Sequence, residues 1–90
     1  MSNTNIERQI SDKVAEILDN IDNGFTTKAG LECEELADLY VKSGQRAKAK
    51  EAMESAAEYY RRVLETNKNG EAPFARKRLN RVKKRLLDIA

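Results

Sequence analysis

Apolar side chains recur every three or four residues along most of the chain, and this spacing constrains the fold more than any other feature. It places the apolar side chains on one face of an α-helix, because a helix turns once in about 3.6 residues. In the first segment the pattern consists of Ile6, Ile10, Val14, Ile17 and Ile21. The 90-residue chain holds one Pro and four Gly, so few residues interrupt a helix.

The pattern predicts an all-α fold, a four-helix bundle in which all 90 residues form a single helical domain. The predicted helices span residues 4–22, 27–42, 45–67 and 72–89. Thr4 and Glu7 have the spacing of a capping box, so the first helix is expected to start at Thr4. Gly24 is expected to end that helix in the left-handed conformation, and Thr26 or Thr27 to cap the second helix.

A second pattern combines small and large side chains at fixed spacing in the middle of the chain. It consists of Cys33, Leu36, Ala37, Tyr40, Gly44, Ala49, Met53 and Ala56. This order resembles the tetratricopeptide repeat (TPR), a helix-turn-helix of about 34 residues with W-x2-L-G-x2-Y followed by A-x3-F. Cys33 stands at the Trp position and Met53 at the Phe position. The resemblance covers residues 28–63, and it implies a TPR-like antiparallel hairpin, flanked by one helix on each side, that binds other proteins.

The resemblance also implies where a partner would bind, because peptides in this family often lie along the face lined by the first helix of a repeat. The outward-facing residues of that helix are Glu34, Asp38, Val41 and Lys42. Since Glu34 and Asp38 are acidic, a peptide bound here is expected to be basic. In the structural alternative, which we favour, both carboxylates face the chain's own basic fourth helix or solvent.

Charge is distributed unevenly along the chain. Residues 1–43 carry four basic and nine acidic side chains, whereas residues 44–90 carry thirteen basic and six acidic ones. Seven of the cations fall within residues 76–85, on one predicted helix. Four of them are candidate contacts for an anion or a nucleic acid: Arg76, Lys77, Arg81 and Lys84. The alternative is a solvated helix face, which is favoured by the wide angular spread of the cations and by the lack of an interleaved aromatic residue for base stacking.

The sequence offers no support for catalysis. The chain has no His, one Cys and no Gly-rich phosphate loop, so the usual general base, the commonest zinc ligand and a phosphate cradle are missing. We therefore expect no enzymatic activity and no metal or other cofactor. Cys33 is expected to be a small buried hydrophobic residue and not a reactive thiol.

Three features of the sequence bear on its location. No apolar run approaches the roughly 20 residues of a membrane span, so we expect no span. The first residues lack the basic and apolar segments of a secretory signal. A single Cys cannot form an internal disulfide, and a cytoplasmic protein is therefore expected.

Together these features predict a non-catalytic protein–protein interaction module, an adaptor or assembly subunit whose protein partner the sequence does not identify. The alternative is a small nucleic-acid-associated protein that uses the basic C-terminal helix. A homodimer is also predicted, because an apolar stripe on the fourth helix has the spacing of a coiled-coil seam. The stripe consists of Leu79, Val82, Leu86 and Ile89.

Overall fold

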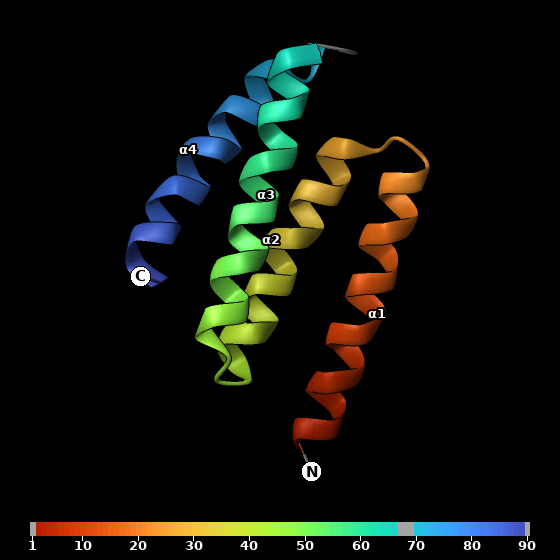
Figure 1. Cartoon of the computed structure of the whole chain (residues 1–90), viewed down its shortest axis with the longest axis vertical. Helices are drawn as coiled ribbons and strands as arrows, with labels where there is room; N and C mark the ends of the chain where they lie inside the picture. Colours follow the sequence, from red (N-terminus) through yellow and green to blue (C-terminus); the bar gives the residue numbers. More distant parts are fainter. Residues whose placement is uncertain (1, 67–69, 90) are drawn as a thin grey trace.

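Four α-helices make up the computed structural model, which describes the backbone of residues 2–66 and 70–89 and the side chains of residues 5–66 and 70–89. The helices are α1 (Ser2–Asp22), α2 (Thr26–Lys42), α3 (Arg46–Thr66) and α4 (Ala72–Ile89). Each helix runs antiparallel to the one before it (Figure 1). The predicted all-α fold of four helices is confirmed, and the helix ends that can be compared differ from the predicted ones by one or two residues at most. The predicted end of the third helix at residue 67 lies outside the described residues.

The two helix starts that we predicted from threonine residues differ in the structure. α1 begins at Ser2, so Thr4 lies within its first turn; the two polar residues before Thr4 also suit a helix start, and the helix extends through them. α2 has Phe25 at its cap position, and no side chain makes a capping hydrogen bond there. Neither Thr26 nor Thr27 is therefore the cap.

The turn between α1 and α2 explains why no threonine caps the second helix. Gly24 has φ +78°, in the left-handed region that ends many helices. Its N–H donates to the carbonyl of Ile21 (3.0 Å), and the N–H of Phe25 donates to that of Asn20 (2.8 Å). The carbonyl of Phe25 then accepts the N–H of Ala29 at 2.9 Å. Phe25 thus makes both a hydrogen bond that ends α1 and a hydrogen bond that begins α2. No further residue is left between the two helices to act as a cap.

The turn between α2 and α3 repeats this geometry. Gly44 has φ +79°, and its N–H donates to the carbonyl of Val41 at 3.0 Å. The N–H of Gln45 donates to the carbonyl of Tyr40 at 2.8 Å, while the carbonyl of Gln45 accepts the N–H of Ala49 at 3.0 Å. Such a short reversal holds α2 and α3 side by side as an antiparallel hairpin.

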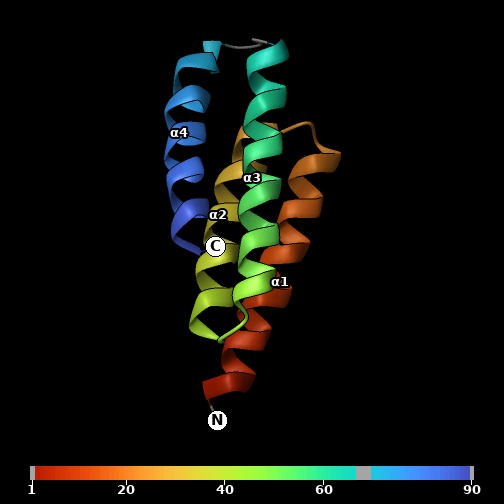
Figure 2. The ribbon, with the colours of Figure 1, turned by 60° about the vertical axis from the view of Figure 1, so that its left-hand side comes forward.

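α2 lies in the middle of the fold: it packs against α1 and α3, and α3 in turn packs against α4 (Figure 1 and Figure 2). The result is a flat array with principal dimensions of 43 × 29 × 14 Å. Small side chains without exposed surface line the contact between α2 and α3: Ala37, Ala49 and Ala56. Small residues at such a contact allow two helix axes to approach closely.

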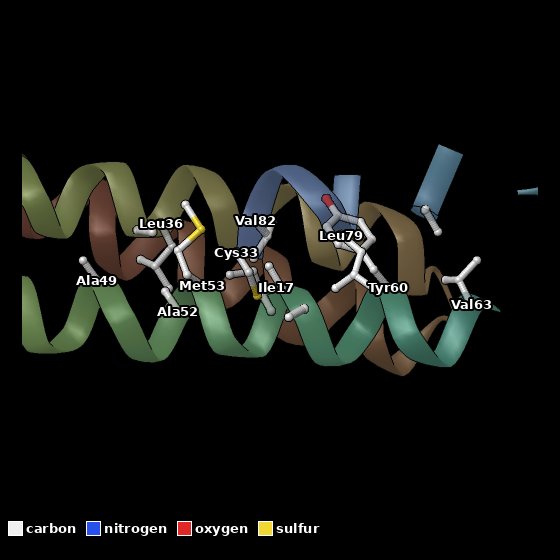
Figure 3. Packing of buried hydrophobic residues seen from close by; sticks show 14 residues of the cluster. Ile17, Cys33, Leu36, Ala49, Ala52, Met53, Tyr60, Val63, Leu79 and Val82 are labelled. Carbon is white, nitrogen blue, oxygen red and sulfur yellow. The ribbon is translucent and has the colours of Figure 1, made fainter. Parts of the chain in front are cut away.

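Large side chains fill the core between α2, α3 and α4 (Figure 3). The largest of those that are fully buried are Met53 and Tyr60 from α3 and Val82 from α4. Ile17 of α1 is buried in the same cluster, so all four helices contribute to one core.

The apolar stripe of α4 faces this core. Leu79 and Val82 are buried, and Leu86 and Ile89 pack against the buried cluster. The stripe therefore covers the apolar face of α3 within the chain. The homodimer stays a prediction from the sequence.

Candidate functional site

Glu34 lies at the centre of a buried ionic cluster between α2, α3 and α4. It is 3% exposed, although a carboxylate is rarely buried without partners. Arg78 donates to both of its oxygens, from Nη2 to Oε1 at 2.8 Å and from Nε to Oε2 at 3.1 Å. The hydroxyl of the fully buried Tyr60 donates to Oε2 at 2.5 Å. Both oxygens of Glu34 thus accept hydrogen bonds, which offsets the cost of removing the charge from water.

A second ion pair continues the cluster along the same two helices. Arg85 pairs with Asp38, and its Nη1 lies 4.0 Å from Oε1 of Glu34. Glu34 and Asp38 are neighbours on one face of α2, and Arg78 and Arg85 share one face of α4, so the helices present rows of opposite charge to each other. We call Glu34, Asp38, Tyr60, Arg78 and Arg85 the α2–α4 ionic cluster.

The surroundings of the cluster determine its protonation. Burial is the main cause that raises the pKa of the Tyr60 hydroxyl, and the hydrogen bond to Glu34 and the negative charge of Glu34 raise it further. Tyr60 therefore keeps its proton and remains a donor. The hydrogen bond to Glu34 raises the pKa of Arg78, which is charged in any case. Tyr60 and Arg78 are therefore both donors to Glu34 at neutral pH.

The ionic cluster shows which interpretation of the acidic residues on α2 is right. Glu34 and Asp38 face the chain's own basic helix, as in the structural alternative. The prediction that Glu34 contacts a partner is wrong, because its carboxylate is buried and fully occupied. Asp38 keeps 54% of its side chain exposed but is paired with Arg85. The negative charge that was expected to attract a basic peptide is thus neutralised.

The other residues of the predicted partner-binding face lie together in a groove at the C-terminal ends of α2 and α4. Asp38, Val41 and Lys42 line it from α2, and Val41 is 48% exposed. The rest of its lining consists of Gly44, Arg46, Arg85, Asp88 and Ile89. The groove has a volume of about 730 Å³, and we call it the α2–α4 groove.

The four candidate nucleic-acid contacts lie on the outer edge of α4, away from its buried stripe. These exposed residues are Arg76, Lys77, Arg81 and Lys84. None of the four forms an ion pair within the part of the chain that the structure describes. The structure thus separates the seven cations of residues 76–85 into two that pair inside the fold and five that face solvent.

Phe74 is an aromatic residue at this edge, although no aromatic residue was expected among the cations. It is 44% exposed, and it lines a hollow of about 320 Å³ together with Lys77, Arg78 and Arg81. Its position three residues before Lys77, one turn away on the same side of the helix, is the signal that would have found it. An aromatic residue does accompany the cations.

A second buried carboxylate, Glu32, was also missed. It is 7% exposed and accepts a hydrogen bond from Nδ2 of Asn20, while its Oε2 has no partner among the described residues. Burial, followed by a hydrogen bond and the charge of Glu16, raises the pKa of Glu32. Its place three residues after Ala29 and four before Leu36, both on the inward face of the helix, is the signal that would have suggested its burial.

Reactive groups are sparse in the structure. Cys33 is buried, and burial, together with the charges of Glu32 and Glu34, raises the pKa of its thiol to about 12. At neutral pH it is therefore an uncharged thiol, which agrees with its expected role in the core. Within residues 5–66 and 70–89, no three potential ligands among His, Cys, Asp and Glu gather at one place.

Comparisons with protein-family models, with curated proteins and with solved structures gave no match. The TPR resemblance of residues 28–63 therefore stays a prediction from the sequence. None of the described helices combines the length and the apolar character needed to cross a membrane.

Proposed function

We propose that this chain is a non-catalytic protein–protein interaction module, an adaptor or assembly subunit, that binds its partner in the α2–α4 groove. The observation that carries the proposal is the ionic cluster, which holds α2 and α4 together with an open groove beside it. Ion pairs that fix the two helices beside the groove suit binding, because less ordering of the groove is then required when a partner arrives.

The groove selects a partner mainly by shape and apolar contact. Val41 and Ile89 supply apolar surface to it. Charged residues of both signs surround them: Lys42, Arg46 and Asp88. Because Arg85 neutralises Asp38, the groove has no excess of negative charge that would require a basic peptide. An amphipathic segment that inserts an apolar side chain is the partner this lining favours.

A capture experiment with two matched surface variants tests the proposal. Val41→Glu places a charge in the groove, whereas Leu18→Glu changes a similarly exposed residue of α1 (58% exposed). The tagged chain and the Leu18→Glu variant should recover the same partner from an extract of the source cells, identified by mass spectrometry. The Val41→Glu variant should lose it while keeping its circular dichroism spectrum. Equal recovery by both variants would contradict binding in the groove.

A second candidate function is association with nucleic acid through α4. The observation that favours it is the set of five exposed cations on this helix, none of which forms an ion pair within the described residues. Such cations can replace the counterions of a phosphate backbone. The two functions use different surfaces, the groove and the outer edge of α4, so variants of one surface leave the other intact.

A further inference from the structure

The two internal ion pairs of α4 leave a strongly basic outer edge. Arg78 and Arg85 turn towards α2, where Glu34 and Asp38 neutralise them. The exposed cations that remain are Arg76, Lys77, Arg81, Lys83 and Lys84. Asp88 is the only acidic residue in α4, so this edge carries an excess of positive charge. An edge of one sign attracts a polyanion over distances of about a Debye length, roughly 8–10 Å.

Three of these cations form a ridge. Lys77, Arg81 and Lys84 follow one another at intervals of four and three residues. At about 100° per residue they lie within about 60° of each other around the helix. At about 1.5 Å per residue they extend over about 10 Å along its axis, enough to contact successive phosphates of one strand.

Phe74 stands at one end of this ridge. It shares a hollow of about 320 Å³ with Lys77, Arg78 and Arg81, so an aromatic ring and cations meet in one place. Exposing 44% of a Phe side chain to water is unfavourable, and a flat ring that covers it would recover hydrophobic free energy. A nucleic-acid base offers such a ring, joined to a phosphate that the neighbouring cations can bind.

We propose that the outer edge of α4 is a binding site for single-stranded nucleic acid, in which Phe74 stacks on a base and Lys77, Arg81 and Lys84 bind the adjacent phosphates. The proposal rests on the second candidate function and specifies its ligand. A duplex fits less well, because its bases are already stacked on one another. An acidic protein, or a second copy of this chain bound through its acidic α1, would use the cations but has no need of Phe74.

The test measures binding of a fluorescently labelled dodecamer of deoxythymidine by anisotropy, at 50 and 200 mM salt. With about three phosphate contacts the slope of log K against log salt should be about −2, so affinity should fall about 20-fold over this range. Phe74→Ala should weaken binding about tenfold and leave the slope unchanged, because it removes stacking and no charge.

Charge variants complete the test. Arg81→Glu should weaken binding more than tenfold and flatten the salt dependence, since one phosphate contact is removed and a repulsive charge is introduced. Lys50→Glu, on the exposed side of α3, changes the net charge equally and should weaken binding less than threefold. Circular dichroism of each variant should show unchanged helix content, because all three residues are exposed.

Three results would overturn the proposal, and they separate it from the function on which it rests. If Phe74→Ala has no effect, or a duplex binds as tightly, nucleic-acid association stands but the single-strand site is wrong. If no nucleic acid binds at 50 mM salt, both are wrong. If polyglutamate binds equally well, or if light scattering shows self-association that Arg81→Glu abolishes, the edge serves an acidic protein or a second copy of the chain.

Discussion

Gly30 and Tyr60 show how a single side chain is accommodated between two helices. Tyr60 is fully buried, and Figure 3 shows it extending from α3 into the core beside Leu79 of α4. A Cβ atom on Gly30 would lie 2.7 Å from Cε1 of this ring, closer than side chains tolerate. Gly30 has no positive φ, so its value here is the space that it leaves and not its backbone freedom.

We therefore expect Gly30→Ala to destabilise the fold. In a helix interior alanine is more favourable than glycine by about 1 kcal/mol. The ring of Tyr60, however, is held by packing and by its hydrogen bond to Glu34, so overpacking should cost about 1–3 kcal/mol, which leaves a net loss of up to about 2 kcal/mol. Urea unfolding followed by circular dichroism measures the difference. Ala15→Gly, at an exposed position of α1, isolates the helix-propensity term. A stabilised Gly30→Ala protein would mean that Tyr60 moves aside at little cost.

The raised pKa of Glu32 predicts how the stability of the fold depends on pH. Its pKa is raised in the folded chain by burial and by Glu16, so the folded state binds this proton more tightly than the unfolded state does. The resulting stabilisation is present below the ordinary carboxyl value of 4.5 and is lost as the pH rises through the folded pKa. At neutral pH the ionised Glu32 therefore lowers the stability of the fold.

Glu32→Gln should raise the free energy of unfolding at pH 7 by about 1 kcal/mol, because Gln still accepts a hydrogen bond from Asn20 and carries no charge. At about pH 4, where Glu32 is largely protonated in both states, the variant and the parent should differ little. Urea unfolding at the two pH values measures this, with the exposed Glu35→Gln as the control. Equal effects at both pH values would show that the charge of Glu32 is not the cause.

At the scale of the helices, α4 is attached by two kinds of contact. Its apolar stripe covers α3, and its Arg78 and Arg85 reach α2, a helix that precedes it by two in the chain. Hydrophobic contact supplies most of the attachment and tolerates some sliding, whereas two oriented ion pairs favour one register. The ionic cluster thus defines how α4 sits on the α2–α3 hairpin.

Glu34→Gln should loosen α4 selectively. Arg78 would then lack its anionic partner at a site where only 26% of its side chain is exposed, and loss of such a partner costs about 3 kcal/mol. Native-state hydrogen exchange should show a larger loss of protection in α4 than in α1. The exposed Glu54→Gln on α3 should change neither helix. A uniform loss along the chain would instead indicate that α4 does not open on its own.

For the whole molecule, the arrangement as a flat array leaves two edges of opposite charge. α1 forms one edge, and its exposed acidic residues are Glu7, Asp12, Glu16, Asp19 and Asp22. α4 forms the other edge (Figure 2). Cations prevail among its exposed charged residues. The uneven distribution of charge along the sequence becomes a separation in space, reduced only where the ionic cluster brings the two signs together.

Because the apolar stripe of α4 packs against the core, we expect that it does not mediate self-association. Leu79→Ala should lower the free energy of unfolding by about 2–4 kcal/mol and leave the molar mass from light scattering unchanged, because Leu79 lies in the core. Leu87→Ala, on the same helix but 79% exposed, should change the stability by less than about 0.5 kcal/mol. A halved mass with little loss of stability in Leu79→Ala would instead identify the stripe as a dimer seam.

The candidate sites were predictable only in part. Exposure of Arg76, Lys77, Arg81 and Lys84 follows from their angular distance from the apolar stripe. The burial of Glu34 does not, because it depends on Arg78, 44 residues further along the chain. No local pattern shows which carboxylate will meet which cation. The aromatic neighbour of the cations was overlooked because sequence order places Phe74 at a helix start, whereas the helix surface places it beside Lys77.

Local periodicity, together with glycine at two of the turns, was sufficient to predict four antiparallel helices and their apolar faces, since these depend on residues within one or two turns of each other. Tertiary structure alone determined which charged residues pair with one another inside the fold. Glu34 and Asp38 changed from candidate contacts to internal partners because α4 packs against α3 and its Arg78 and Arg85 reach α2. Burial and pairing depend on distances across the fold, and these distances cannot be derived from the spacing of residues along the chain.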